Sequence, residues 1–184
     1  MKFRICTLLA VTLISSSAMA QICKTTIAPS NQLEQYVFSH DGIVVDARTG
    51  LMWQRCTVGQ TWNADNRSCG GQPTHFESWE EAMNGYAGTE AESYGGFDGW
   101  RLPNIKELET IVERSCYSPA INDTVFPSTP NAVTYSSTPD DKVNDSLNGR
   151  VIDFVSGAEF VRDVNQHRYV RLVREVQAQD FDSE

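Results

Sequence analysis

Oxygen-bearing side chains gather in one short stretch, residues 140–148, which reads Asp-Asp-Lys-Val-Asn-Asp-Ser-Leu-Asn. A calcium ion takes about six to eight oxygen ligands, and carboxylates together with Asn amides supply them. The stretch is therefore a candidate calcium and ligand site, and calcium is the one cofactor that the sequence suggests. Its candidate ligands are Asp140, Asp141, Asn144 and Asp145. The alternative is a solvated surface loop, because Asp and Asn are ordinary turn formers and Lys142 interrupts the acidic run.

Aromatic side chains offer a second kind of binding chemistry, because their rings can stack on sugars. The four tryptophans are Trp53, Trp62, Trp79 and Trp100. Trp53 falls in a predicted strand and Trp79 on the apolar face of a predicted helix, so both are expected in the core. Trp62 lies in a loop between Thr61 and Asn63, and it is the aromatic candidate for ligand binding. Packing beneath that loop is the alternative.

Catalytic signatures are missing from the sequence. His40, His75 and His167 are far apart in sequence, and none pairs with a nucleophile at a known spacing. Neither a G-x-S-x-G elbow, an H-E-x-x-H helix nor a phosphate-cradling glycine loop occurs. We therefore predict no catalytic residues and a protein that is not an enzyme. A hydrolase assembled from residues far apart in the sequence is the alternative.

The N-terminus has the layout of a secretory signal peptide. Lys2 and Arg4 precede an apolar stretch at residues 5–14, and residues 18–20 supply the small Ala-Met-Ala site of a signal peptidase. We expect cleavage before Gln21 and a location in the periplasm or outside the cell. An uncleaved membrane anchor is one alternative, but the apolar stretch is shorter than the ~20 residues of a spanning helix. A lipid-anchored cysteine is another, although the residues before it do not fit a lipid-attachment box.

Composition limits the partners. The chain carries 15 Lys and Arg against 24 Asp and Glu, for a formal net charge of −9. Loss of residues 1–20 removes two basic side chains. The remaining chain then has 13 Lys and Arg against 24 Asp and Glu, for a formal net charge of −11. This acidity argues against nucleic acid, which requires a basic stripe. The remaining length is typical of a single domain.

Four cysteines remain in the exported chain, and an even number indicates disulfides. No C-x-x-C pair or paired-histidine motif occurs, so a zinc site is not favoured. Three pairings are open from the sequence alone. We choose Cys56–Cys69, which closes a short loop, and Cys23–Cys116, which ties the N-terminus to the middle of the domain.

The hydrophobic pattern predicts the elements that position these residues. Residues 43–46 and 51–54 are typical of a hairpin. Ser78 and Asn104 each precede a Glu by three positions, as in the capping box that begins a helix. The two apolar helix stripes are Trp79, Ala82, Met83 and Tyr86, and Ile105, Leu108, Ile111 and Val112. The last third predicts strands at residues 133–137, 151–155, 158–162 and 169–173, with a polar loop at 138–149.

One arginine has a structural interpretation, and three others lie in or beside the last predicted strand. Arg101 lies between Trp100 and Leu102 at a helix entrance, where it is expected to bond backbone carbonyls or a buried carboxylate. The other three are Arg168, Arg171 and Arg174. On a strand, residues three apart face opposite sides, so these three do not predict a continuous basic stripe.

Two long motifs, residues 46–56 (Asp-Ala-Arg-Thr-Gly-Leu-Met-Trp-Gln-Arg-Cys) and 99–108 (Gly-Trp-Arg-Leu-Pro-Asn-Ile-Lys-Glu-Leu), are distinctive. They resemble the opening and central motifs of the Lcl C-terminal domain family, named after a bacterial collagen-like adhesin. Shorter elements at 126–127, 135–137 and 169–174 resemble its closing part, so the resemblance covers about residues 22–175. It implies a C-type-lectin-like fold and an adhesive role, and the adhesin itself binds sulfated glycans. This chain differs in lacking collagen-like repeats and in its acidity.

These observations predict a fold and a function. The chain is divided into a signal peptide (residues 1–20), an extended N-terminal arm (21–40), one domain (41–175) and an acidic flexible tail (176–184). The domain is expected to be α+β and C-type-lectin-like, with two central helices packed on antiparallel strands and two disulfides.

The predicted function is an exported, non-enzymatic binding or adhesion module of the bacterial envelope, with carbohydrate binding as its expected activity. A surface glycan or an envelope protein is its expected partner. The alternative is a structural or accessory subunit of an envelope assembly, without a ligand site of its own. The sequence leaves the oligomeric state open.

Overall fold

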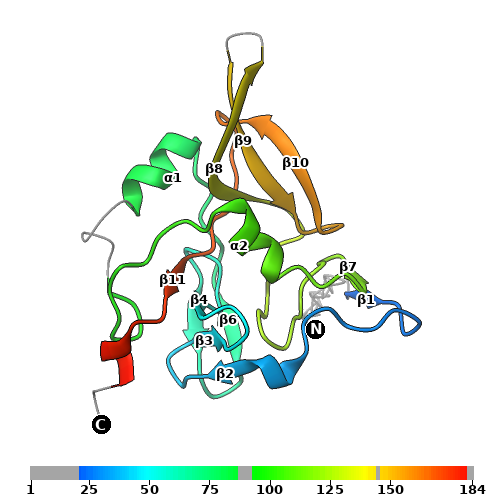
Figure 1. Cartoon of the computed structure of the whole chain (residues 1–184), viewed down its shortest axis with the longest axis vertical. Helices are drawn as coiled ribbons and strands as arrows, with labels where there is room; N and C mark the ends of the chain where they lie inside the picture. The colour runs from blue at the N-terminus through cyan, green and yellow to red at the C-terminus, as the bar shows by residue number, and fades with distance from the viewer. Residues whose placement is uncertain (1–20, 87–92, 144–145, 182–184) are drawn as a thin grey trace, which may run out of the picture.

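The computed structural model describes residues 21–86, 93–143 and 146–181. The expected signal peptide, residues 1–20, lies outside this part of the chain. Strands dominate the described residues and form four sheets, two large and two small (Figure 1). Over the same residues, we find no helix with the length and apolar character needed to cross a bilayer.

The four-stranded sheet contains the predicted hairpin. Its order is β11 (Val173–Glu175), β4 (Leu51–Gln54), β3 (Ile43–Asp46) and β2 (Tyr36–Phe38). β3 and β4 occupy the predicted residues and pair in antiparallel register, which confirms the hairpin. Between them, the Asp46 carboxylate accepts a 2.9 Å hydrogen bond from the amide of Arg48, and Gly50 has a φ of 69°. That φ is unstrained for glycine and strained for other residues.

The three-stranded sheet corrects the prediction for residues 138–149. Its order is β10 (Ala158–Asp163), β9 (Ser146–Asp153) and β8 (Val133–Val143), and the β8–β9 hairpin extends from the top of Figure 1. The predicted polar loop is therefore wrong, because both strands continue through most of it. Arg150 forms ion pairs with Asp140 at 2.8 Å and with Glu159 at 2.5 Å. Such cross-strand pairs stabilise polar strands that show no apolar alternation.

Each small sheet is held by a disulfide. The sheets are β1 (Ile22–Cys23) with β7 (Cys116–Tyr117), and β5 (Thr61–Asn63) with β6 (Ser68–Gly70). Cys23 lies opposite Cys116 in the first ladder and is bonded to it. Cys69 in β6 is bonded to Cys56, which follows β4. The structure thus joins the cysteines in the two pairs chosen from the sequence.

The two helices begin where their caps predict. α1 (Trp79–Gly85) is capped by the Ser78 hydroxyl, which accepts a hydrogen bond from the amide of Glu81. α2 (Ile105–Thr110) is capped by Asn104, and the Glu107 carboxylate completes the capping box. Capping residues therefore located both helix starts correctly.

The predicted α+β, C-type-lectin-like fold with two central helices packed on strands is wrong, because the chain is mostly β. Each helix is about two turns long or less, which is too short to present a continuous face. Only Ala82 of α1, and Ile105 and Leu108 of α2, are buried. Ile111 and Val112, the rest of the second predicted stripe, are buried beyond the helix end.

Two apolar clusters join the large sheets. One contains Val44 and Trp53 from the four-stranded sheet together with Ile152 from β9. The other contains Met52, Trp100 and Tyr135 among its members. Trp53 and Trp100 have no exposed surface, so Trp53 is a core residue as predicted.

Both ends of the described chain are held by contacts. The N-terminal arm contributes β1 and β2, and the side-chain amide of Gln21 donates hydrogen bonds to the carbonyls of Pro119 and Ile121. At the other end, η2 (Ala178–Phe181) carries Asp180, which forms a 2.8 Å ion pair with Arg174. The first part of the predicted tail is thus attached to the body, while residues 182–184 lie outside the described chain.

The three C-terminal arginines depart from the predicted alternation. Regular strand begins only at Val173, so residues 168–172 do not alternate as a strand would. Arg168, Arg171 and Arg174 are all at least 95% buried. Arg168 and Arg174 bond to acceptors within six residues, Gln166 and Asp180 among them. Every acceptor of Arg171 in the described chain is at least 42 residues away in the sequence.

Arg101 bonds a carboxylate, as predicted, although that carboxylate is only partly buried. Its guanidinium binds Glu107 with two hydrogen bonds of 2.8 and 2.7 Å, and the Glu107 side chain is 13% exposed. Burial raises the pKa of Glu107, but bonds from Arg101 and from the Asn104 amide outweigh burial and leave that pKa lowered. The carboxylate therefore stabilises the fold only while it is ionised.

Replacing Glu107 with Gln is expected to lower the free energy of unfolding at pH 7 by about 1–2 kcal/mol, since a partly exposed charge-assisted pair is lost. The folded pKa is depressed, so this contribution is full above the unfolded pKa and fades as pH falls through the folded value. Urea unfolding of both proteins from pH 7 down to pH 3 measures it. A difference that stays constant over this range would contradict the assignment.

Candidate functional site

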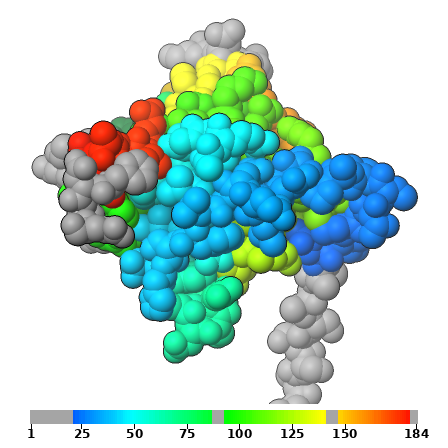
Figure 2. Space-filling model, turned by 60° about the horizontal axis from the view of Figure 1, so that its bottom comes forward, coloured from blue at the N-terminus to red at the C-terminus, as the bar shows by residue number. Residues whose placement is uncertain are grey.

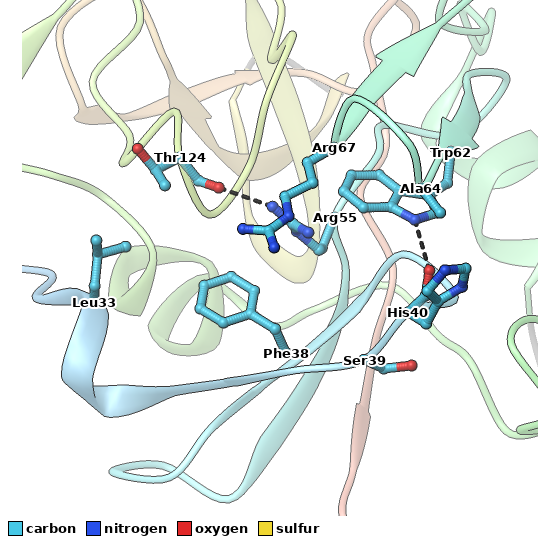
Figure 3. A pocket seen from close by; sticks show the side chains of 9 residues that line it. All are labelled: Leu33, Phe38, Ser39, His40, Arg55, Trp62, Ala64, Arg67 and Thr124. Atoms are coloured by element: carbon cyan, nitrogen blue, oxygen red, sulfur yellow. Dashed lines mark hydrogen bonds between the residues drawn. The ribbon is translucent and has the colours of Figure 1, made fainter.

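A hollow lies between the N-terminal arm and the β5–β6 hairpin (Figure 3). Its volume is about 510 Å³. It is lined by Leu33, Phe38, Ser39, His40, Arg55, Trp62, Ala64, Arg67 and Thr124. We call it the Trp62 pocket. The lining comes from four separate segments, so the pocket exists only in the folded chain.

Arg55 ties these segments together. Its Nε and Nη2 atoms donate 2.8 Å hydrogen bonds to the carbonyls of Val125 and Thr124, which fixes the guanidinium at the base of the hollow. The guanidinium lies 4.9 Å from the ring centre of Phe38 and 4.2 Å from that of Trp62. Cations at these distances attract an aromatic face. One side chain thus holds both aromatic walls.

The pocket is positively charged. Burial, followed by the nearby charge of Arg67, lowers the pKa of Arg55 to about 10. Arg55 therefore stays protonated at neutral pH. No Asp or Glu is among the lining residues. This local positive charge contrasts with the formal charge of −9 on the whole chain.

Trp62 is positioned by its hairpin and by the arm. It lies opposite Cys69 in the β5–β6 ladder, so the Cys56–Cys69 disulfide holds its strand. Its indole Nε1 donates a 2.8 Å hydrogen bond to the carbonyl of His40. A Cβ added at Gly42 would lie 2.5 Å from Trp62 Cγ, so the ring can pack here only against glycine. Trp62 is half-buried, with part of its surface open to the pocket.

The polar and histidine side chains at and near the pocket have local partners. The Ser39 hydroxyl and the Asp41 carboxylate are 3.4 Å apart in a local turn, and no histidine bonds either of them in the described residues. His40 contributes its carbonyl to Trp62, and His75 stacks on Tyr169 with ring centres 4.3 Å apart. No nucleophile is therefore joined to a base at this site.

The predicted calcium site is only partly described. Asp140 lies in β8, and its carboxylate is paired with Arg150 at 2.8 Å. Asn144, Asp145 and the side chain of Asp141 fall outside the described residues. Within the described ranges, no group of three or more Asp, Glu, His or Cys side chains is placed to hold a metal.

Sequence reasoning singled out Trp62 and missed its neighbours. Phe38 was assigned to a weakly patterned arm, and Arg55 was noted only as part of a motif. The acceptors of Arg55 are about 70 positions away, at Thr124 and Val125. Its place next to Cys56, a predicted disulfide cysteine, was the one local signal for the importance of Arg55.

Comparison with known proteins identifies a family for this chain. The family model described as the Lcl C-terminal domain matches residues 42–174, which is most of the chain. No curated protein and no solved structure matches. The matched range includes Arg55, Trp62 and Thr124, but it starts after Phe38. The arm side of the Trp62 pocket therefore lies outside the family match.

Proposed function

Because this chain belongs to the Lcl C-terminal domain family, we propose that it is an exported, non-enzymatic adhesion-type module that binds a surface glycan in the Trp62 pocket. The observation that carries this proposal is the pair of aromatic rings held on one fixed guanidinium. A sugar ring has apolar C–H faces and polar edges. Aromatic walls with a few placed donors match both features.

The size and exposure of the pocket support this proposal. Its volume, about 510 Å³, lies in the usual range for small-ligand sites. Phe38 is 44% exposed and Leu33 43% exposed, so a ligand would cover apolar surface that now faces water. Burying such surface favours binding. The rigid base at Arg55 reduces the ordering cost.

The disulfides support export, because such bonds persist in oxidising compartments. The periplasm and the outside of the cell both meet this condition. The bacterial envelope is therefore the proposed place of action, with residues 1–20 as the proposed signal peptide.

The first test is a glycan array probed with the purified exported chain, once with calcium and once with a chelator. Binding in both conditions supports the Trp62 pocket. Binding only with calcium would move the site to Asp140, Asp141, Asn144 and Asp145. The absence of binding in either condition would contradict the glycan proposal.

A Trp62→Ala substitution is expected to weaken binding of an array-positive glycan by about 30-fold, as for a central aromatic contact worth about 2 kcal/mol. Trp62→Phe should retain part of the affinity, since it keeps a ring. Tyr117→Ala is the matched control, because it removes an exposed ring at β7. Titration calorimetry measures the affinities, and an equal loss for both alanine variants would exclude the pocket.

A subunit of an envelope assembly is the second candidate. The edge strand β2 favours it, because Val37 is 62% exposed there and no other described strand pairs with the outer side of β2. Exposed edges with apolar side chains are typical pairing sites. Crosslinking in envelope preparations tests it, and a Val37→Lys variant with an unchanged crosslinking pattern would argue against this edge.

A further inference from the structure

A second hollow, of about 340 Å³, lies beside the Cys23–Cys116 disulfide, away from the Trp62 pocket. Its rim carries Ile27, Tyr117 and Val155, each 40–43% exposed. Ile22, which is 50% exposed, lies opposite Tyr117 in the β1–β7 ladder. Side chains opposite each other across a ladder project to the same side, so Ile22 extends this apolar surface.

Two cations border the same hollow. Lys24 and Arg114 line it, both are exposed, and neither forms a salt bridge to a described residue. No Asp or Glu is among its lining residues. In a chain with a formal charge of −9, this is a local reversal of sign.

The surface is held rigidly. The amide of Lys24 donates to the carbonyl of Ser115 at 2.8 Å, and that of Ser118 donates to Val155 at 2.9 Å. The disulfide crosslinks the two strands between these bonds. Figure 2 shows the N-terminal arm, in blue, lying at the surface on this side of the molecule. Its side chains are therefore presented to a partner with little further ordering.

We propose that the arm surface, formed by Ile22, Lys24, Ile27, Arg114, Tyr117 and Val155, docks on a membrane that contains anionic lipids. Exposed aliphatic side chains, a tyrosine and flanking cations are the combination that binds the interface between lipid headgroups and acyl chains. Lys24 and Arg114 complement anionic headgroups. The acidic remainder of the chain is repelled by the same headgroups and therefore faces away from the membrane.

The position of the surface in the chain agrees with this. The described chain starts at Gln21, which is fixed beside β7 by its bonds to Pro119 and Ile121. The apolar stretch at residues 5–14 lies earlier in the sequence, with six residues between it and Gln21. In the sequence, the arm surface thus begins next to the proposed signal peptide, and this step rests on the proposed function. Docking here leaves the Trp62 pocket, on a different part of the arm, available to its ligand.

The test is co-sedimentation of the exported chain, its N-terminus defined by mass spectrometry, with vesicles of phosphatidylcholine alone or mixed with phosphatidylglycerol. We expect binding to the mixed vesicles that weakens with added salt. Lys24→Glu and Arg114→Glu should each reduce it about fivefold or more, the effect of losing one cation near an anionic surface. Ile27→Ser should reduce binding at every salt concentration, since it removes apolar contact only.

Arg162→Glu is the matched control, because Arg162 is exposed on β10 and its reversal changes the net charge equally. It should bind as the unchanged chain does. Equal losses for Arg162→Glu and Arg114→Glu would overturn the proposal, as would equal binding to both vesicle types or to neither. Sedimentation velocity without lipid tests a different occupant, a second copy of the chain. A dimer that dissociates in the Ile27→Ser variant would show that the arm surface binds another copy and would overturn the membrane proposal.

Discussion

Replacing Arg171 with Met is expected to lower the free energy of unfolding by about 4 kcal/mol, the cost of removing one partner from a buried polar network. Arg171 is 1% exposed. Its Nη1 atom donates to the carbonyls of Gln54 and Arg55, and its Nη2 atom donates to the hydroxyls of Thr57 and Thr129 at 3.2 and 2.7 Å. The guanidinium also lies 5.0 Å from the ring centre of Phe126.

Two effects oppose each other in this substitution. Burial lowers the pKa of Arg171, which shows that the cation is costly to bury, and Met would remove that cost. Met would also leave the carbonyls of Gln54 and Arg55 buried without a donor, at about 1–3 kcal/mol for each. The hydroxyls can rotate to new partners, but the carbonyls cannot. We therefore expect the loss of donors to outweigh the relief of burial, so that Arg171→Met lowers the free energy of unfolding.

Guanidinium chloride unfolding followed by circular dichroism measures the effect. Arg162→Met is the control, since it makes the same chemical change at an exposed position and should stay within about 0.5 kcal/mol. Arg171→Lys should recover only part of the stability, because an ammonium cannot reach four acceptors in a plane. A loss below 1 kcal/mol for Arg171→Met would show that the acceptors find other donors.

Arg171 also shows where sequence reasoning on the fold stops. The hairpin of β3 and β4 was predicted because its strands and its turn at Gly50 are local signals. The capping signals that predict helix starts at Ser78 and Asn104 are local as well. Helix length was overestimated because Ile111 keeps the apolar spacing although α2 ends at Thr110. The apolar spacing indicates which side chains are buried, and buried side chains continue past the last residue of the helix.

Long-range acceptors account for the other errors. Arg171 is buried by carbonyls about 116 positions earlier in the chain, and no local pattern contains that information. Polar residues of β8 and β9 form strands because Arg150 finds Asp140 and Glu159 across the sheet. An alternation rule depends on apolar residues, so it predicts the strand at 133–137 but a loop in place of the far part of this hairpin, residues 138–149.

In the candidate site too, some residues have a local signal in the sequence and others depend on contacts between distant segments. Trp62 is a candidate from the sequence because a tryptophan between polar residues in a disulfide loop has a local signature, and its role in binding stays a prediction. Phe38 and Arg55 were not found, since their roles depend on the arm crossing the β5–β6 hairpin in space. Both predicted disulfides are present in the structure, and Cys56–Cys69 also lies next to the Trp62 pocket.

Replacing Cys23 and Cys116 together with Ser is expected to lower the free energy of unfolding by about 4.6 kcal/mol, because the bond closes a loop with a sequence separation of 93. Replacing Cys56 and Cys69 should cost about 3 kcal/mol, since their separation is 13. Denaturant unfolding under non-reducing conditions measures both. The order of the two losses follows from loop length in the unfolded chain.

Their effects on the Trp62 pocket should have the opposite order. The β5–β6 hairpin forms a separate two-stranded sheet, and Cys69 lies opposite Trp62 in it. Loss of Cys56–Cys69 therefore frees the ring from Arg55, so acrylamide should quench the Trp62 emission more strongly, with Trp62→Phe in the same background identifying that emission. Loss of Cys23–Cys116 frees the arm at β1 and should leave quenching unchanged in buffer that keeps the chain folded. If the variant without Cys23–Cys116 showed the stronger quenching, the exposure of Trp62 would depend on global stability. The local role of the short disulfide loop would then be refuted.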